Sequence, residues 1–326
     1  MAYCMASRAY DNFFKDRTLL ITGGAGFIGS TLATKLVALG AHVRILDDFS
    51  TGHKSNVELL PVEVFEGSVS DELLLNKSIA GCDAIFHLAA MVSVPASVEN
   101  PERCFEINTR GTQLVLQHAS MLGVRRVLFA ASSSAYGPHA AIPSTESMTP
   151  DPASPYAESK IAGEEAILGC AQNSKTDAAS LRYFNIFGPN QDPHSQYAAV
   201  VAAFMEALLN KRNPQIYGDG SQTRDFTFID NAVHANLLAA SFDKPLRGEV
   251  FNIGTGTSFS LLDMLDAMSK EIGVRPEIDF HPIREGDVPH SRADITKSTQ
   301  TFGYEPIVSF EEGISRLFTD CAGLPA

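Results

Sequence analysis

The stretch TGGAGFIGS at residues 22–30 decides the fold. It directly follows a short apolar and β-branched run at residues 18–21, and a helical pattern follows it. Gly23, Gly26 and Gly29 are spaced by three. In a strand–turn–helix unit, glycines at this spacing permit the tight turn, let the backbone approach a pyrophosphate, and allow the helix to pack closely on the strand. The stretch therefore predicts a dinucleotide site at the amino end of a helix.

From residue 18 onward, short apolar or β-branched runs alternate with helical patterns, which is typical of right-handed βαβ units and a parallel sheet. We expect strands at residues 18–21, 42–46, 62–65, 84–88, 126–130 and 179–184. The predicted fold class is α/β: a Rossmann-type, doubly wound parallel sheet with a smaller mixed α/β substrate domain.

The predicted division of the chain has three parts. Residues 1–16 mix charged and apolar residues and are expected to be a loose N-terminal tail. Residues 17–184 would form the dinucleotide-binding domain, to which the chain returns at about 224–253. Residues 185–326 are richer in loops with Gly, Pro and Asn, and would form a substrate domain over the carboxyl edge of the sheet.

Two carboxylates, Asp47 and Asp48, follow the second predicted strand, about 20 residues after the glycine turn. A carboxylate there holds the adenosine ribose hydroxyls, and two of them would repel a 2′-phosphate. We therefore expect NAD rather than NADP. His87, at the end of the fourth strand, receives no role, because a lone histidine in such a place is more often packed than functional.

Tyr156 and Lys160 lie in SPYAESK, one helical turn apart, and the serine-rich SSSAYG follows the fifth predicted strand at residues 132–137. A phenol must lose about three pKa units to be half ionised at neutral pH, which requires about 4 kcal/mol. A cation about 4 Å away supplies energy of that order. Lys160 and a positive nicotinamide ring could together make Tyr156 a base, and a serine hydroxyl would hold the substrate oxygen.

The composition excludes several classes of partner. A net charge of −13 argues against nucleic acid and anionic lipid, which require a positive surface. No apolar run approaches the roughly 18 residues of a membrane span. Five scattered cysteines show no spacing typical of a metal site or disulfide framework, so we expect no metal and a reducing cytoplasm.

Further motifs extend the pattern over nearly the whole chain from residue 18. They are RYFNIFGP (182–189), QDPHSQYAAV (191–200), GDGSQTRDF (218–226), FNIGTG (251–256) and REGDVPHS (284–291). Together with the glycine turn and the Tyr–Lys pair, the chain resembles the extended short-chain dehydrogenase/reductases that act on nucleotide sugars. Within them it most resembles the UDP-hexose 4-epimerases, and residues 191–200 are similar to the UDP-N-acetylhexosamine subgroup.

The resemblance implies the site residues and their roles. The catalytic set would be Ser132, Tyr156 and Lys160, with Ser133 beside them. NAD would contact Gly23, Gly26, Phe27, Ile28, Gly29, Asp47, Asp48, Ser50, Thr51, Gly52, Ser68, Val69, Leu88, Ala89, Ala90, Tyr156, Lys160 and Tyr183. The UDP-hexose would contact Ser93, Ser133, Ser134, Asn185 (diphosphate), Ala199, Val200, Tyr217 (uracil), Arg224 and Arg284 (diphosphate), Asp287 (ribose) and Ser291 (sugar).

The chain departs from many relatives in two places. Ser68 stands where they have an aspartate that meets the adenine amino group, and residues 89–94 lack a lysine that some 4-epimerases place near the cofactor phosphates. Both departures predict weaker NAD retention than in those relatives.

The expected reaction is reversible 4-epimerisation of UDP-hexoses, both N-acetylated and plain, by transient oxidation at C4. A 4,6-dehydratase would place an Asp–Glu pair where Ser133 and Ser134 stand, and a UDP-glucuronate decarboxylase also expects an acid there. A non-catalytic NAD sensor would not need the complete catalytic set. The resemblance also implies a homodimer through helices at about 102–121 and 155–171, and Ile107, Leu114 and Met121 recur at seven-residue spacing on the first.

Overall fold

The computed structural model describes residues 10–191, 200–283 and 288–321. At its centre lies a seven-stranded parallel sheet in the order β11-β6-β5-β4-β1-β2-β3. The strands are β1 (Thr18–Thr22), β2 (His42–Asp47), β3 (Glu63–Glu66), β4 (Ala84–His87), β5 (Arg126–Ser132), β6 (Asp177–Tyr183) and β11 (Val250–Ile253). The predicted α/β class is confirmed, and each of the six expected strands is present.

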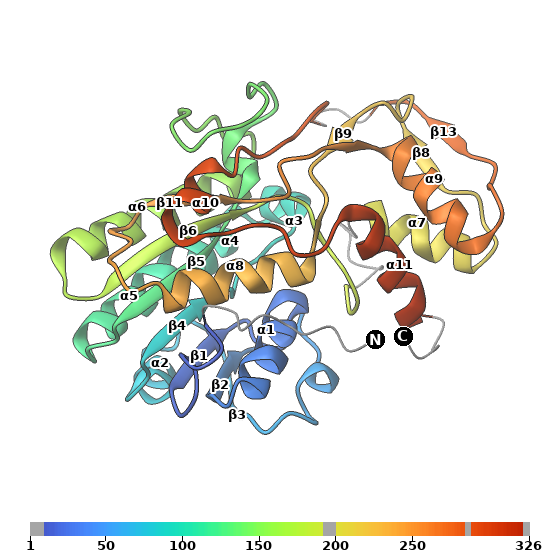
Figure 1. The fold of residues 1–326 in the computed structure, drawn as a ribbon. Coiled ribbons are helices and arrows are strands. Elements are labelled where there is room, and N and C mark those ends of the chain that lie inside the picture. Colours follow the sequence, from blue (N-terminus) through green and yellow to red (C-terminus); the bar gives the residue numbers. More distant parts are fainter. Residues whose placement is uncertain (1–9, 192–199, 284–287, 322–326) are drawn as a thin grey trace.

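Helices cover both faces of the sheet (Figure 1). One apolar cluster joins α1 (Phe27–Ala38) and α8 (Ile229–Ser241) to one face, and a second joins α2 (Glu72–Ile79), α5 (Gly111–Met121) and α6 (Pro155–Asn173) to the other. Strand β1 shows the alternation that this requires, because Leu19 and Ile21 belong to the first cluster and Leu20 to the second. A strand covered on both faces is apolar at successive positions, as Leu19, Leu20 and Ile21 are.

The C-terminal part carries short strand pairs and single helices beside the sheet (Figure 1). The pairs are β8 (Gln215–Tyr217) with β13 (Asp279–His281), β9 (Thr223–Arg224) with β12 (Phe259–Ser260), and β7 (Ile186–Phe187) with β10 (Thr227–Phe228). The helices are α7 (Val200–Leu209), α9 (Leu261–Ile272), α10 (Thr296–Phe302) and α11 (Phe310–Cys321). Side chains of α7 and α9 belong to the same apolar cluster as those of α1 and α8, so this part shares a core with one face of the sheet.

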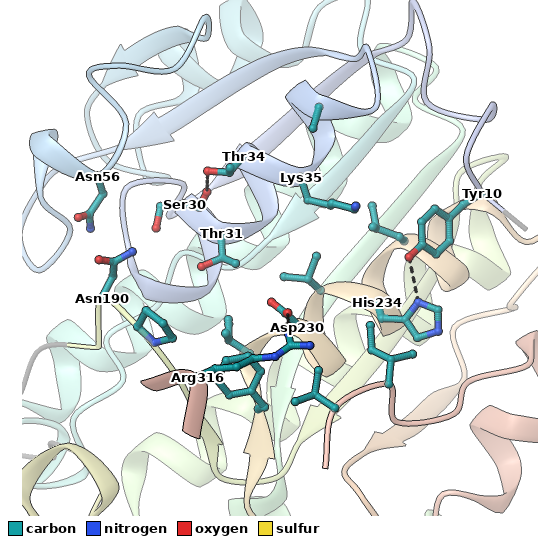
Figure 2. Close-up of a pocket in the computed structure, with 18 residues that line it drawn as sticks. Tyr10, Ser30, Thr31, Thr34, Lys35, Asn56, Asn190, Asp230, His234 and Arg316 are labelled. Carbon is teal, nitrogen blue, oxygen red and sulfur yellow. Dashed lines mark hydrogen bonds and ion pairs between the residues drawn. The ribbon is translucent and has the colours of Figure 1, made fainter. Parts of the chain in front are cut away.

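The segment before β1 differs from the expected loose tail. Tyr10 and Phe14 are fully buried, and the Tyr10 hydroxyl forms a 3.0 Å hydrogen bond with Nδ1 of His234 on α8, at the edge of a cavity of about 620 Å³ (Figure 2). The Phe13 ring lies 4.3 Å from the Arg17 guanidinium. For residues 10–16 the prediction of a loose tail is therefore wrong, because their aromatic side chains pack in the core. Residues 1–9 lie outside the described part.

Between β4 and β5 the chain forms α3 (Val94–Glu99), α4 (Pro101–Phe105), a π-helical turn (Glu106–Arg110) and α5 in succession. A 3-10 turn, η1 (Lys54–Asn56), follows β2, and another, η3 (Ser133–Tyr136), follows β5. No helix in the described ranges is long and apolar enough to cross a membrane.

Candidate active site

The glycine turn packs tightly against the end of β4. Gly23 has φ +70°, and a Cβ there would lie 2.7 Å from the Ala89 nitrogen, while a Cβ on Gly29 would lie 2.2 Å from the Gly23 oxygen. Both positions therefore require glycine. Gly26 is the N-cap of α1 and provides no side-chain cap, so the amides of the first turn remain available to an anion. These features fit a pyrophosphate at the start of α1.

The two predicted carboxylates have different surroundings. Asp47 is buried, and its Oδ2 and Oδ1 each accept a 2.8 Å hydrogen bond, from the Ala25 and Phe49 nitrogens. Desolvation raises the Asp47 pKa, and these backbone bonds oppose the rise. Asp48 is exposed, and its Oδ1 accepts from the Ser50 nitrogen and hydroxyl. Each oxygen of Asp47 keeps a free lone pair for a ribose hydroxyl, so Asp47 fits that role better than Asp48.

The other predicted cofactor residues gather around the same edge of the sheet. Ser50, Thr51 and Gly52 follow β2, Ser68 and Val69 follow β3, Leu88, Ala89 and Ala90 follow β4, and Phe27 and Ile28 begin α1. The Ser68 hydroxyl bonds that of Ser70 at 2.8 Å, and Tyr183 ends β6 with its hydroxyl accepting from Asn236 at 2.7 Å. One neighbour was not predicted: Asn56 donates to the Ala25 oxygen at 2.8 Å and steadies the glycine turn.

The predicted catalytic side chains come from β5 and α6. Ser132 ends β5 and pairs with Tyr183 of β6. Helix α6 begins with an N-cap at Ser154, whose side chain accepts from the Ala157 nitrogen, so Tyr156 and Lys160 occupy its first two turns. Lys160 is 3% exposed; its Nζ donates to the Ala130 oxygen at 2.9 Å and lies 5.9 Å from the Tyr156 ring centroid.

Burial shifts both pKa values. Desolvation raises the pKa of the Tyr156 phenol, and a hydrogen bond with Ser132 opposes the rise. Desolvation lowers the pKa of Lys160 to about 8, while Cys104 and Glu164 oppose the fall. In the cofactor-free protein the phenol is therefore protonated at neutral pH, and a further positive charge is needed to ionise it.

The side chains predicted to bind the substrate lie near the same edge of the sheet. Ser93 is the N-cap of α3, and Ser133 and Ser134 lie in η3. Ser134 Oγ is buried and, among the residues that the structure describes, has no hydrogen-bond partner. A buried hydroxyl without a partner is consistent with a site where a polar group of the substrate forms the hydrogen bond. Asn185 donates to the Ser291 hydroxyl at 3.5 Å, which joins two predicted residues far apart in sequence.

The residues expected to bind the uracil end of the substrate lie in the C-terminal part of the chain. Tyr217 ends β8, and its ring stacks on His281 of β13 with 5.2 Å between centroids, beside a cavity of about 900 Å³. Arg224 lies on β9 and donates to the Thr223 oxygen at 3.0 Å. Val200 begins α7. Ala199, Arg284 and Asp287 lie outside the described residues.

Two buried polar groups complete the surroundings of Lys160. His87 bonds Thr22 Oγ1 at 2.7 Å and Thr112 Oγ1 at 2.9 Å, and burial together with Lys160 lowers its pKa to about 3. It is a packed, neutral histidine. Asn108, which was not predicted, accepts from the Met91 nitrogen at 2.7 Å and donates to Ser159 Oγ at 2.9 Å, and so ties the loop after β4 to α6. The described residues contain no cluster of metal-ligating side chains.

The comparison with known families agrees with this geometry. The model of the NAD dependent epimerase/dehydratase family matches residues 19–254. The chain belongs to this family. Its cofactor is NAD. The curated UDP-glucose 4-epimerase of Mycolicibacterium smegmatis is 38% identical over 307 residues, which cover 91% of this chain and 96% of that one.

Two solved structures of family members are similar throughout. The UDP-N-acetylglucosamine 4-epimerase of Methanobrevibacter ruminantium, in complex with UDP-N-acetylmuramic acid, has a TM-score of 0.90 at 32% identity and covers 95% of this chain and 99% of its own. The UDP-glucose 4-epimerase of Thermotoga maritima, with UDP-glucose, has a TM-score of 0.89 at 35% identity, with 94% and 99% coverage.

Proposed function

We propose that this protein is a UDP-hexose 4-epimerase. One observation carries the proposal: Ser132, Tyr156 and Lys160 meet at the sheet edge where the glycine turn and Asp47 fit NAD. The names of the similar proteins support it, since a UDP-glucose 4-epimerase and a UDP-N-acetylglucosamine 4-epimerase match over nearly the whole chain. Cys82 and Cys104 are buried free thiols, and we infer from them a reducing, cytoplasmic setting, because disulfides are rare there.

The mechanism follows from the placement of these groups. NAD, when bound, would supply a reversible hydride acceptor for C4 of the sugar, and its positive ring would favour the ionised phenol. Ser132 would hold the O4 hydroxyl, and Tyr156 would take its proton and later return it. Lys160 holds a positive charge beside the phenolate. Because the sugar is oxidised and then reduced at the same carbon, the net reaction consumes no oxidant.

The residues after Ser132 favour epimerisation over loss of water. A dehydratase needs an acid–base pair there to remove a hydroxyl and a proton, whereas Ser133 and Ser134 have hydroxyls that do not ionise near neutral pH. The same substitution disfavours decarboxylation of a UDP-glucuronate. The 4-keto sugar would therefore survive long enough to turn over and accept the hydride on its other face.

Replacement of Tyr156 by Phe tests the mechanism. We expect turnover of UDP-glucose to fall by about 100-fold or more, because a positioned acid–base group contributes that much. Product chromatography measures the rate, and bound NAD serves as the check that the site is intact. A variant that keeps near-normal turnover would exclude Tyr156 as the base.

Ser291 supports a broad sugar range. Its small side chain lies beside Asn185 at the predicted sugar pocket, where a tyrosine would fill the space of an N-acetyl group. We infer that UDP-N-acetylglucosamine and UDP-N-acetylgalactosamine are converted, and UDP-glucose and UDP-galactose too, since an open pocket rejects a smaller sugar only weakly.

The Ser291→Tyr variant tests whether the size of this side chain determines which sugars are accepted. Overpacking costs about 1–3 kcal/mol, so kcat/KM for the acetylated pair should fall by roughly 10- to 100-fold with little change for the plain pair. Equal conversion of acetylated sugars by both proteins would show that Ser291 does not border the N-acetyl group.

A further inference from the structure

A buried ion pair fastens the catalytic helix to the sheet. The Arg182 guanidinium on β6 donates from Nε to Oε1 of Glu164 at 2.7 Å and from Nη2 to Oε2 at 2.6 Å. The two side chains are 3% and 7% exposed. Desolvation makes such pairs poor sources of stability, so a role other than stability is a reasonable hypothesis for this one.

The pair lies next to the proposed catalytic groups. Glu164 follows Lys160 by one turn on α6, so both side chains project from one face of the helix, and both are buried. Arg182 immediately precedes Tyr183, the β6 partner of Ser132. The ion pair therefore joins the helix of Tyr156 and Lys160 to the strand beside Ser132.

The guanidinium has few other partners. Its carbon lies 4.6 Å from the Tyr136 ring centroid, and Nη1 is buried without a hydrogen-bond partner among the described residues. The partners of Arg182 are thus Glu164 and Tyr136. The two hydrogen bonds from Arg182 occupy one lone pair on each oxygen of the Glu164 carboxyl group and fix its orientation.

The charges facing Lys160 come from several elements. Its own helix contributes Tyr156 and Glu164, α4 contributes the buried Cys104, and β6 contributes Arg182 behind Glu164. From β4 comes His87, which is neutral because its pKa is about 3, and from β5 only the Ala130 carbonyl and the Phe129 ring. Glu164 is the carboxylate in this set that opposes the desolvation of the ammonium.

We propose that the Arg182–Glu164 pair is a positioning pair that holds the Glu164 carboxylate one turn from Lys160 and so keeps the Lys160 ammonium charged. The inference rests on the proposed roles of Tyr156 and Lys160. Without this carboxylate, Lys160 would lose its proton nearer neutral pH, and the phenolate of Tyr156 would lose its neighbouring cation.

The test measures Lys160 directly in the NAD-bound protein. Lysine side chains labelled with ¹³C and ¹⁵N are titrated by NMR, and the Lys160 signal is assigned by its absence in Lys160→Arg. In Glu164→Gln we expect the Lys160 pKa to fall by about two units, the order of one charge about 6 Å away at an effective dielectric near 20. Glu165→Gln, an exposed position on the same helix, is the matched control and should leave the pKa unchanged.

Kinetics give a second readout that a purely structural role would not move. The alkaline limb of the kcat profile for UDP-glucose should shift to lower pH by the same amount in Glu164→Gln, with KM changed by no more than about twofold. Glu164→Asp, which keeps the charge, should restore the limb.

Folding is checked by thermal unfolding and NAD content. If Glu164→Gln does not fold, the double variant Glu164→Gln/Arg182→Met removes both buried charges, and we expect a smaller fall in the same pKa. An unchanged Lys160 pKa in the folded variant overturns the proposal, whatever happens to activity. A native protein that converts no UDP-sugar would instead refute the proposed function, and the titration would still decide the role of Glu164.

Discussion

At the scale of single residues, burial separates neighbours that look alike in sequence. Asp47 and Asp48 are adjacent carboxylates, yet Asp47 is buried against the glycine turn through the Ala25 nitrogen, whereas Asp48 is exposed and closes a local turn with Ser50. A buried carboxylate with spare lone pairs binds hydroxyls more strongly than an exposed one, because water competes less.

We therefore expect Asp47→Ala to weaken the affinity for NAD and Asp48→Ala to leave it nearly unchanged. A hydrogen bond to a charged group contributes about 1.5–3 kcal/mol, so NAD affinity should weaken by roughly 10- to 100-fold in the first variant. Cofactor content after purification and calorimetric titration with NAD measure the difference. Equal losses in the two variants would contradict the assignment of the ribose to Asp47.

Gly23, Tyr156 and Lys160 were predictable from the sequence because each belongs to a motif with a characteristic local spacing. The Glu164–Arg182 ion pair was not predicted, and neither was the hydrogen bond from Asn108 to Ser159. Each of these contacts joins two elements through a fold that must be known first. A single charged residue in a helix or strand carries no mark of the partner it will meet.

At the scale of elements, the strands of the sheet that form apolar and β-branched runs were predictable, whereas the very short strands and the irregular N-terminal segment were not. Strand β11 is not among the six predicted strands, although it lies in the stretch at about 224–253 where the chain was expected to return to the dinucleotide-binding domain. The two-residue strands β7, β9, β10 and β12 are too short to show a period. Residues 10–14 were predicted to belong to a tail because charged residues are mixed with the aromatic ones there, yet Tyr10 and Phe14 are buried and Phe13 packs against the core.

That segment should contribute measurably to stability. Tyr10→Ala removes a fully buried ring and leaves the Nδ1 of His234 without this hydroxyl, so the free energy of unfolding should fall by about 3 kcal/mol or more. Asn12→Ala, at an exposed position two residues away, is the control and should change little. Denaturant unfolding followed by circular dichroism compares the three proteins, and equal midpoints would show that the packing of Tyr10 is energetically neutral.

At the scale of the whole molecule, we propose assembly as a homodimer through α5 and α6. The family resemblance implies this assembly, and the seven-residue stripe that added support divides between two surfaces, because Leu114 is buried in the core and Met121 is 69% exposed. Leu168 on α6 is also exposed, at 42%. Exposed apolar side chains on these two helices, which pack on each other, are consistent with a surface that a second copy covers.

Light scattering tests the assembly. The native protein should be a dimer at micromolar concentration, and Leu168→Arg should make it monomeric by burying a charge in the interface. Leu73→Arg on α2, an equally apolar and more exposed position, should leave the dimer intact. A native monomer, or a dimer that tolerates Leu168→Arg, would place the contact elsewhere or exclude it.

The order of the strands also determines how the chain can fold. Strand β11 completes the sheet beside β6, but β6 ends at Tyr183 and β11 begins at Val250, after α7 and α8 have been made. An emerging chain therefore exposes the edge of β6 until much later residues leave the ribosome, and closing so long a loop carries an entropic cost. An unpaired apolar strand is a site of aggregation, so synthesis and refolding of this protein should be most vulnerable in the interval before residue 253 appears.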